Sequence, residues 1–524
     1  MVWKIDDTQG DEASKVKYDV VRYTRGIGLD LGCGPTKAFP NAIGVDNKKD
    51  TELFGIEMKP QLVVEDCADL SSYIHQESCD FVFSSHLLEH IEDAGAAVAH
   101  WWTLLKVGGY LILYLPHRDL YPNIGQPGAN PDHKHDFVPE DVVAMVPLGW
   151  DLVMKETRDQ GREYSFLLVF KKTSRGEGGN TASYLDPKPA KTAIVVRHGG
   201  YGDQLQAASI LPALKRQGFH ITILTTPKGR SVLDHDPHID DWFMVDVDQV
   251  PNPELGPFWE ALSKRYDRFI NLNESVEGTF LALPGRIQHT WPHRVRHRRM
   301  NENYSEFAAL LADVPFVPEG RFYATPEEEK EAKRFVSAKE YSVMWVLAGS
   351  SPHKFTPHMD DIIHMILVGL PAARVFLVGD EACKILEQGW EDNDRVTRLS
   401  GTQTIRETLA LSQVMNHVVG PETGVLNCVA YEPMITKTVL LSHSSAENLT
   451  KHWPSTIAIP GVAPCYPCHQ LHFTSQYCPR DEKTYAAICQ ANINPLDIYN
   501  TVFMAYQSWD RAQVLRRSVI NDPY

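Results

Sequence analysis

The carboxylate of Asp203 and the ammonium group of Lys354 are of the types that a group-transfer reaction needs. Asp203 follows the glycine-rich turn 199–202, where an ionised carboxylate could take a proton from an attacking hydroxyl. Lys354 follows an apolar run, and its charge could stabilise a leaving phosphate without a metal ion. Each residue alone also has an ordinary explanation, Asp203 as a helix cap and Lys354 as a surface lysine.

Asp203 lies in a segment that predicts a strand, a tight turn and a helix. An apolar run precedes the glycines, and apolar residues then recur at helical spacing as far as Leu214. Glycines let the backbone approach a ligand, and the start of a helix favours negative charge. Further strands at 221–225, 242–245 and 268–272 alternate with helical patterns, so we expect a parallel, doubly wound sheet.

A second series of strands and helices begins at Tyr341 and positions Lys354. Its main strands are expected at 343–347, 374–378 and 417–419. Polar residues follow these strands: Lys354, Glu381, Glu422, Thr423 and Gly424. Ligands of parallel sheets bind at the carboxyl ends of the strands, so two sheets in tandem predict a cleft between two Rossmann-like domains.

Residues 192 to about 509 resemble glycosyltransferase family 9, the heptosyltransferases. The resemblance implies a GT-B fold and inverting transfer from a nucleotide sugar, with an ADP-heptose-like donor favoured. It implies that Asp203 is the base and that Lys354 holds the donor diphosphate. It also assigns Glu381 to the donor ribose and Glu422, Thr423 and Gly424 to the sugar and phosphates. Glu422 stands where the family usually has aspartate, which leaves the identity of the sugar open.

The first part of the chain carries another glycine turn after a strand. The sequence Asp30-Leu31-Gly32-Cys33-Gly34 ends one short apolar strand, and a second strand at 42–45 ends in Asp46. In dinucleotide sites, glycines admit the ligand and an acidic residue after the next strand accepts ribose hydroxyls. The spacing therefore predicts a nucleoside-containing ligand.

This part resembles class I S-adenosylmethionine-dependent methyltransferases of type 11 over about 170 residues. Later signals follow in the family's order at 63–67, 79–90 and 105–115. The resemblance implies an α/β, Rossmann-like domain in which Asp46 holds the ribose and Asp30 supports the turn. The implied cofactor-binding residues are Asp30, Gly32, Gly34, Asp46, Asp66, Cys67 and Ser84. Thr36 replaces the third glycine of the looser family pattern.

The loop after the expected fifth strand contains His133 and His135. It lies where this family shapes its acceptor site, so either histidine could be an acceptor base. A purely structural loop explains it equally well. A His/Asp metal site is disfavoured, because no second ligand cluster is visible in the sequence.

Four of the nine cysteines fall close together near the end of the chain. They are Cys465, Cys468, Cys478 and Cys489. Two thiolates on one turn and two from flanking segments can complete a tetrahedral site, so we expect structural iron or zinc rather than four buried thiols. The bacterial autotransporter heptosyltransferases have a comparable four-cysteine segment that holds iron, but the ligand types do not separate the two metals.

Composition sets the broader expectations. A chain of 524 residues is too long for one core. The expected parts are a methyltransferase domain at 1–172, a linker at 173–191, glycosyltransferase domains at 192–335 and 336–509, and a tail at 510–524. The net charge of −16 disfavours broad nucleic-acid binding. No apolar run approaches the ~20 residues of a membrane span, and the polar start is unlike a signal peptide, which favours the cytoplasm.

The combined prediction is a bifunctional methyltransferase and glycosyltransferase whose acceptor is a glycan, a protein or another polymer. Two alternatives stay open: one module is catalytic and the other only binds, or both are idle folds in a scaffold protein. A homo-oligomer is compatible with either. Ligand-dependent melting would separate these possibilities.

Overall fold

The computed structural model describes residues 12–47, 52–53, 56–274, 291–349, 354–469, 471 and 478–521. The chain divides into two compact units. The first is Met1–Ala190 with Phe243–Asp267, and the second is Lys191–Trp242 with Arg268–Tyr524. The segment Phe243–Asp267, expected in the glycosyltransferase part, therefore belongs to the first unit.

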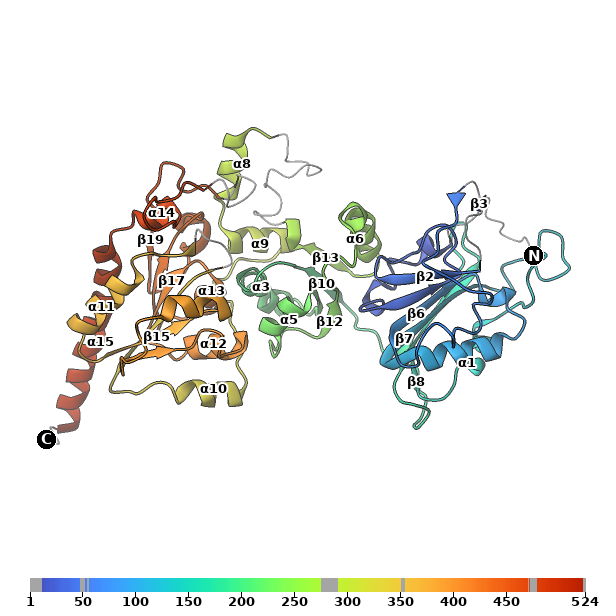
Figure 1. Cartoon of the computed structure of the whole chain (residues 1–524), viewed down its shortest axis with the longest axis horizontal. Coiled ribbons are helices and arrows are strands. Elements are labelled where there is room, and N and C mark those ends of the chain that lie inside the picture. The colour runs from blue at the N-terminus through green and yellow to red at the C-terminus, as the bar shows by residue number, and fades with distance from the viewer. Residues whose placement is uncertain are drawn as a thin grey trace. The chain divides into compact units, whose positions relative to one another are not determined.

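The first unit is built on a seven-stranded sheet of order β5-β2-β1-β6-β7-β9-β8 (Figure 1). Its strands are β1 (Gly28–Leu31), β2 (Ala42–Asp46), β5 (Leu62–Val63), β6 (Cys79–Ser85), β7 (Leu105–Pro116), β8 (Trp150–Arg158) and β9 (Ser165–Lys172). β1 pairs in parallel with β2 and β6, whereas β9 is antiparallel to β7 and β8. The strand order reverses at β1, and such a switch point is where open α/β sheets bind ligands.

Both faces of this sheet are covered, because successive side chains of a strand point to opposite faces. On β6, Phe81 and Phe83 pack in one core with Phe39, while Val82 packs in the other core with Trp101. The helices of the unit are α1 (Ala94–Leu104), α2 (Pro139–Met145) and α6 (Leu255–Ser263), and a short hairpin joins β3 (Glu52–Leu53) to β4 (Ile56–Glu57).

The second unit contains a four-stranded and a six-stranded sheet, of order β12-β11-β10-β13 and β16-β15-β14-β17-β18-β19. The first has β10 (Thr192–Val196), β11 (His220–Thr225), β12 (Asp241–Met244) and β13 (Arg268–Asn271). The second has β14 (Tyr341–Val346), β15 (Ala373–Val378), β16 (Val396–Arg398), β17 (His417–Pro421), β18 (Thr436–Leu440) and β19 (Thr456–Ile459). In both sheets the described strands pair in parallel, as expected for Rossmann-like folds: β10 with β11 and β13, β14 with β15 and β17, β15 with β16, and β18 with β17 and β19.

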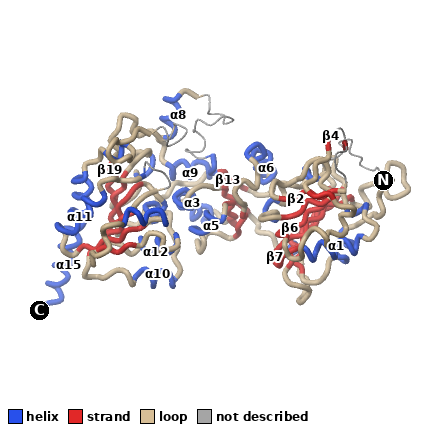
Figure 2. The backbone as a smooth tube through the Cα atoms, in the orientation of Figure 1, coloured by secondary structure: helices blue, strands red, loops and turns tan. Residues whose placement is uncertain are grey.

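Helices lie on both faces of the six-stranded sheet (Figure 2). Helices α11 and α15 pack against one face and α12 against the other. The helices of the unit are α3 (Tyr201–Ala208), α4 (Leu211–Arg216), α5 (Pro227–Leu233), α8 (His293–Met300), α9 (Tyr304–Ala312), α10 (Pro326–Lys333), α11 (Met359–Gly369), α12 (Ile405–Ser412), α13 (Gly424–Cys428), α14 (Ile488–Ala491) and α15 (Pro495–Asn521).

Several boundaries differ from the sequence-based expectation. The helix after the glycine turn is broken into α3 and α4, because Pro212 lies in the first turn of α4 and cannot continue a helix. Helix α15 continues to Asn521, where a tail was expected from residue 510. The predicted linker is partly ordered, since Ser183 hydrogen-bonds to Asp151 of β8.

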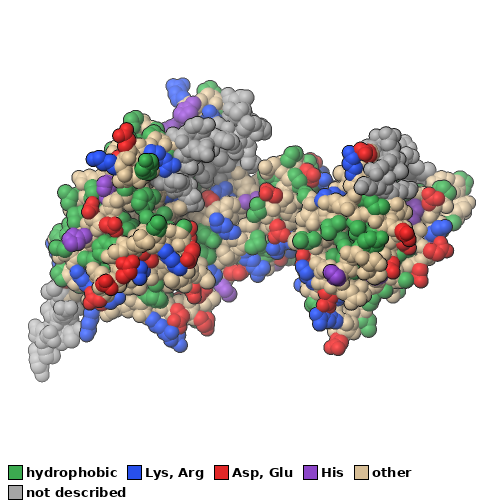
Figure 3. Space-filling view, viewed as in Figure 1, with side chains coloured by type: hydrophobic (Ala, Val, Ile, Leu, Met, Phe, Trp, Pro, Cys, Tyr) green, Lys and Arg blue, Asp and Glu red, His purple; other side chains and the backbone are tan. Residues whose placement is uncertain are grey.

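The surface is mixed in charge. On the face shown in Figure 3, Lys and Arg side chains lie among Asp and Glu side chains. In the described part of the chain, no helix has both the length and the apolar character needed to cross a bilayer.

Candidate active sites

The carboxyl edge of the seven-stranded sheet carries the first glycine turn. Gly32 and Gly34 have φ of +66° and +58°, a region that favours glycine. The N–H of Gly32 donates to the carbonyl of Val45 on β2, which fixes the start of the turn. A Cβ on Gly34 would have no neighbour within 4 Å, so the turn faces open space that a ligand can occupy.

Two acidic side chains hold this turn. Asp46 at the end of β2 accepts from the N–H of Gly34 at 3.0 Å, so it is tied directly to the glycine turn. Asp30 is buried and accepts from the N–H of Ala38 at 2.6 Å. Burial raises the pKa of Asp30 to about 7. Asp46 therefore contacts the glycine turn directly, while Asp30 fixes the backbone that follows it at Ala38.

The other predicted cofactor residues differ in exposure. Ser84 on β6 lies beside Leu31 of β1, is fully buried, and its Oγ has no hydrogen-bond partner among the described residues. Cys67 is buried, whereas Asp66 is exposed and accepts from the N–H of Ala68. An open glycine turn, an acidic strand end and an unpaired buried hydroxyl are features that fit a nucleoside-containing cofactor.

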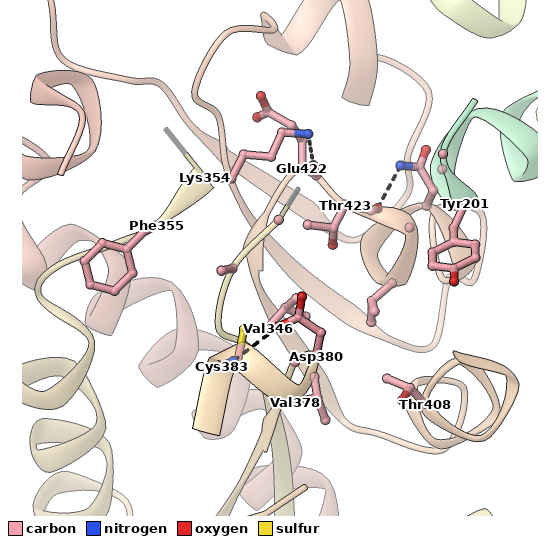
Figure 4. A pocket seen from close by; sticks show the side chains of 18 of the residues that line it. Tyr201, Val346, Lys354, Phe355, Val378, Asp380, Cys383, Thr408, Glu422 and Thr423 are labelled. Atoms are coloured by element: carbon pink, nitrogen blue, oxygen red, sulfur yellow. Dashed lines mark hydrogen bonds between the residues drawn. The ribbon is translucent and has the colours of Figure 1, made fainter. Parts of the chain in front are cut away.

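The second unit encloses a cavity of about 1160 Å³ between its two sheets. Its lining includes Asp203, Lys354, Glu422, Thr423 and Gly424, although these residues come from distant parts of the sequence. Figure 4 shows Lys354, Glu422 and Thr423 among the side chains of this lining. The predicted turn 349–355 lies partly outside the described residues. The cavity thus brings the candidate base and the candidate phosphate-binding lysine to one place.

Asp203 is the third residue of α3, and Gly200 occupies the cap position. Its Oδ2 accepts from the N–H of Gly200 at 2.6 Å, and its Oδ1 lies 2.7 Å from Nη2 of the buried Arg197. The guanidinium therefore holds the carboxylate of Asp203 in one orientation through a charge-assisted hydrogen bond. Asp203 therefore caps its own helix and also faces the cavity.

Lys354 and Glu422 meet through the backbone. Lys354 Nζ donates to the carbonyl oxygen of Glu422 at 2.8 Å (Figure 4). The carboxylate of Glu422 is buried and accepts from Ser442 and His443. Burial opposes its ionisation, but His443, Lys354 and Ser442 together hold the pKa of Glu422 well below its usual range. Its carboxylate is thus engaged in fixing the 442–443 loop.

Thr423 and Asp380 offer polar groups that the protein does not use fully. Thr423 Oγ1 is buried and has no hydrogen-bond partner among the described residues. Asp380 lines the cavity, whereas the predicted ribose-binding Glu381 is absent from the lining, has a 75% exposed side chain and pairs with Lys384. The acidic side chain that this turn presents to the cavity is therefore the one preceding Glu381.

Sequence reasoning missed further cations of the cavity, namely Lys228, His443 and Arg480. Lys228 Nζ lies 4.8 Å from the ring centroid of Tyr201. Arg480 follows Cys478, so its position beside the cavity depends on how the cysteine segment folds back. No local motif marks these three residues, since each lies in a separate loop or helix start.

The cysteine segment contains thiols in different surroundings. Burial, and after it the charges of Cys468, Cys478 and Cys465, raise the pKa of Cys489 to about 12. Cys489 is buried, while Cys465 is exposed. Thiol donors of this kind suit iron or zinc.

The two loop histidines of the first unit have different surroundings. His135 Nε2 hydrogen-bonds to the carbonyl oxygens of Ile91 and Glu92, which is a structural role. His133 is buried and lies in a group with Glu89 and His90, whose potential ligand atoms are all within 4.8 Å of one another. The structure therefore supplies the second ligand cluster that the sequence did not reveal.

Comparisons with known proteins address both units. Residues 29–113 match the family described as methyltransferase domain. No curated protein matches the chain. Among solved structures, the ADP-heptose LPS heptosyltransferase II of E. coli is similar at 14% identity, covering 61% of this chain and 99% of that one, with a TM-score of 0.43.

Two further solved structures are similar to the chain. A family 9 glycosyl transferase of Veillonella parvula is 12% identical over 61% of this chain and 98% of its own, with a TM-score of 0.45. An S-adenosylmethionine-dependent methyltransferase of Archaeoglobus fulgidus is 15% identical over 30% of this chain and 92% of its own, with a TM-score of 0.23. The predicted resemblance is confirmed: the chain joins a methyltransferase domain to a region structurally similar to family 9 glycosyltransferases.

Proposed function

We propose that the chain is a bifunctional transferase, an S-adenosylmethionine-dependent methyltransferase joined to an inverting glycosyltransferase, acting on a glycan, protein or other polymer acceptor. The observation that carries the proposal is the convergence of Asp203, Lys354 and Thr423 on one cavity. These are the residues to which the sequence patterns assign chemistry. Their meeting is expected for a transferase site and is not required of a scaffold.

In the glycosyltransferase site, the acceptor hydroxyl attacks the anomeric carbon of the donor sugar as the bond to phosphate breaks. Asp203 takes the hydroxyl proton, and Arg197 orients its carboxylate. Lys354, with Lys228 and Arg480 nearby in the lining, stabilises the charge that develops on the leaving diphosphate. A single displacement of this kind inverts the anomeric centre.

The cavity favours a nucleoside diphosphate sugar as donor. Val378, Ile385 and Leu386 give its wall an apolar part that suits a base, and Asp380 can accept ribose hydroxyls. The volume exceeds the ~300–1,000 Å³ of ordinary small-molecule pockets, so donor and acceptor sugar have room together. An ADP-heptose-like donor is proposed from the sequence resemblance.

In the methyltransferase site, S-adenosylmethionine would supply a methyl group activated on a sulfonium. Asp46 accepts ribose hydroxyls, and the open space at Gly34 admits the cofactor close to the backbone. Ser84 Oγ offers an unused donor at the switch point. These residues mainly bind and orient, which is the principal contribution a protein makes to an in-line displacement.

The four cysteines are proposed to hold one structural iron or zinc ion. The proposal is supported by the thiol donor set and by the C-x-x-C spacing of Cys465 and Cys468. The ion would stabilise the segment that carries Arg480 to the cavity. It takes no part in the chemistry described above.

Thermal unfolding of the intact chain with single ligands tests both activities. A ligand that binds only the folded state stabilises it by ~2.7 kcal/mol at 100 times its Kd. S-adenosylmethionine or S-adenosylhomocysteine should raise the transition of the first unit, and one class among ADP-, GDP- and UDP-sugars should raise that of the second. Stabilisation by only one ligand type would leave one module as a binding domain, and no shift with any would support the scaffold alternative.

A further inference from the structure

A group of side chains of metal-ligating types lies in the first unit, at the carboxyl edge of the sheet that also carries the glycine turn. Glu89 and His90 belong to a 3₁₀ turn, Leu88–His90, that follows the carboxyl end of β6. His133 lies in the loop between β7 and α2. The distance from Glu89 Oε1 to His133 Nε2 is 3.9 Å, and the rings of His90 and His133 meet edge to face. Two separate loops thus bring three potential ligands of two types together.

Glu89 is the member of this group whose surroundings most clearly indicate a bound partner. Its side chain is fully buried, yet neither carboxylate oxygen has a hydrogen-bond partner among the described residues. His86 Nδ1 lies 3.7 Å and His133 Nε2 3.9 Å from Oε1, and both distances are too long for hydrogen bonds. A buried carboxylate left unpaired costs several kcal/mol in general, so a partner for it is expected.

The orientation of His90 is that of a metal ligand. Its Nδ1 lies 3.2 Å from the carbonyl oxygen of Asp132, so in the tautomer that donates this bond Nε2 is the acceptor nitrogen. Histidines that bind metals commonly donate their other N–H to a carbonyl in this way. The 3₁₀ turn Leu88–His90 is also joined to the loop that carries His133, because the carbonyl of Glu89 accepts from the N–H groups of Lys134 and His135.

We propose that Glu89, His90 and His133 bind a divalent transition-metal ion. One carboxylate and two imidazoles suit zinc, iron(II), manganese or cobalt, and three protein ligands leave coordination positions open. Ligand atoms ~2.1 Å from a tetrahedral ion lie roughly 3.4 Å apart. The observed 3.9 Å between Glu89 and His133 is close to that spacing, so binding requires a small closure of the loop onto the turn.

The role of the ion rests on the proposed methyltransferase activity. The cluster follows β6, whose end also carries Ser84 of the cofactor site. An open coordination position would take a hydroxyl oxygen of the methyl acceptor and lower its pKa, so its proton passes to water. That oxygen then attacks the methyl carbon as the carbon–sulfur bond breaks and its electron pair goes to sulfur. The products are a methyl ether and a neutral thioether.

Cobalt(II) titration of the chelator-treated, intact chain tests the site. Cobalt bound by carboxylate and imidazole gives visible d–d absorption, whereas thiolate ligands add intense charge-transfer absorption in the near ultraviolet. The wild-type chain should therefore bind a cobalt ion that gives d–d absorption without charge-transfer absorption, which is called here the thiolate-free component. Glu89→Gln should weaken that component by more than the ~10–100-fold that loss of an outer-shell partner costs. His75→Gln, which changes an exposed histidine of the same unit, is the matched control.

Two further measurements keep the outcomes separate. Cys465→Ser/Cys468→Ser should remove only the charge-transfer component. Without metal, the wild type and Glu89→Gln should bind S-adenosylmethionine equally well. If neither protein binds S-adenosylmethionine, the proposed methyltransferase activity is wrong, but the proposed metal site is unaffected. Two outcomes would overturn the proposed site. One is equal cobalt binding by the wild type and Glu89→Gln, and the other is the lack of any cobalt absorption that is free of charge transfer.

Discussion

Gln206 Nε2 donates to Asn427 Oδ1 at 3.0 Å, and this bond joins helix α3 to helix α13 at the cavity of the second unit. Asn427 is also held by the carbonyl of Thr423 at 2.8 Å. The two helices come from different sheets, and each starts beside a candidate functional residue. The bond therefore couples the position of the candidate base to that of the donor-binding turn.

The first prediction concerns Asp203. Asp203→Asn keeps the size of the side chain but removes the proton acceptor, so sugar transfer should fall about 100-fold or more. Binding of the nucleotide sugar and of S-adenosylmethionine should persist in isothermal titration. A variant with full transfer activity would exclude Asp203 as the base.

Lys354 should act through the charge on the donor diphosphate. Lys354→Met should lower transfer by about 100-fold, the scale of losing one transition-state contact. Lys384→Met is the control, because Lys384 lies outside the cavity lining and pairs with Glu381. Comparable losses in both variants would point to a general change in charge and not to a contact with the donor.

Asp46 should govern cofactor affinity in the first unit. Hydrogen bonds to a charged group contribute ~1.5–3 kcal/mol, so Asp46→Ala should weaken S-adenosylmethionine binding by about tenfold or more. Asp119→Ala, at an exposed aspartate of the same unit, should leave it unchanged. Titration calorimetry of the wild type and the two variants measures the dissociation constants. An unaltered dissociation constant for Asp46→Ala would show that Asp46 does not contact the ribose.

Stability should depend on pH through Asp30. Its pKa is about 7 in the folded chain against 3.8 for the free group, so the folded state holds the proton more tightly. This contribution to stability is complete below pH ~4 and is lost as pH rises towards ~7. About 3 pKa units at ~1.4 kcal/mol each give a change of up to ~4 kcal/mol.

The variant Asp30→Asn isolates that effect. Its amide oxygen can still accept from Ala38, but it has no proton to lose. The difference in the free energy of unfolding between variant and wild type should therefore grow in favour of the variant between pH 4 and pH 7 in urea titrations. A difference that does not vary with pH would contradict the prediction.

Elemental analysis tests the four-cysteine site. The purified chain should carry about one tightly held iron or zinc ion that depends on the cysteines, in addition to any ion at Glu89, because folding and binding are coupled in such sites. Cys468→Ser should lose it, whereas Cys79→Ser, a buried cysteine of the first unit, should keep it. A stable, metal-free wild-type chain would end this proposal.

Local patterns predicted the elements that position both sites. The strands before Gly32, Asp203 and Glu422 have short apolar runs and glycine turns, which depend on residues close in sequence. The helical break before Leu211 was missed because the periodicity runs on through Ser209, although Pro212 gave a signal for it. The fold class was predictable for the same reason, since alternating strands and helices form parallel sheets.

The contents of the sites were only partly predictable. Glu381 and Asp380 are adjacent, and only the three-dimensional turn decides which of them lines the cavity. The meeting of His133 with Glu89 depends on the packing of two loops more than forty positions apart. Sequence reasoning sees residue types and short spacings, whereas such convergence is set by tertiary contacts.

The segment Phe243–Asp267 affects how the protein is made. Arg265 pairs with Asp19 and Glu156, and the fully buried Phe258 lies against Tyr18. The first unit thus lacks part of its own packing until residue 267 has been synthesised, by which time β10, β11 and β12 have also been made. The two units are interleaved along the messenger, and separating them at residue 190 would leave the first one incomplete.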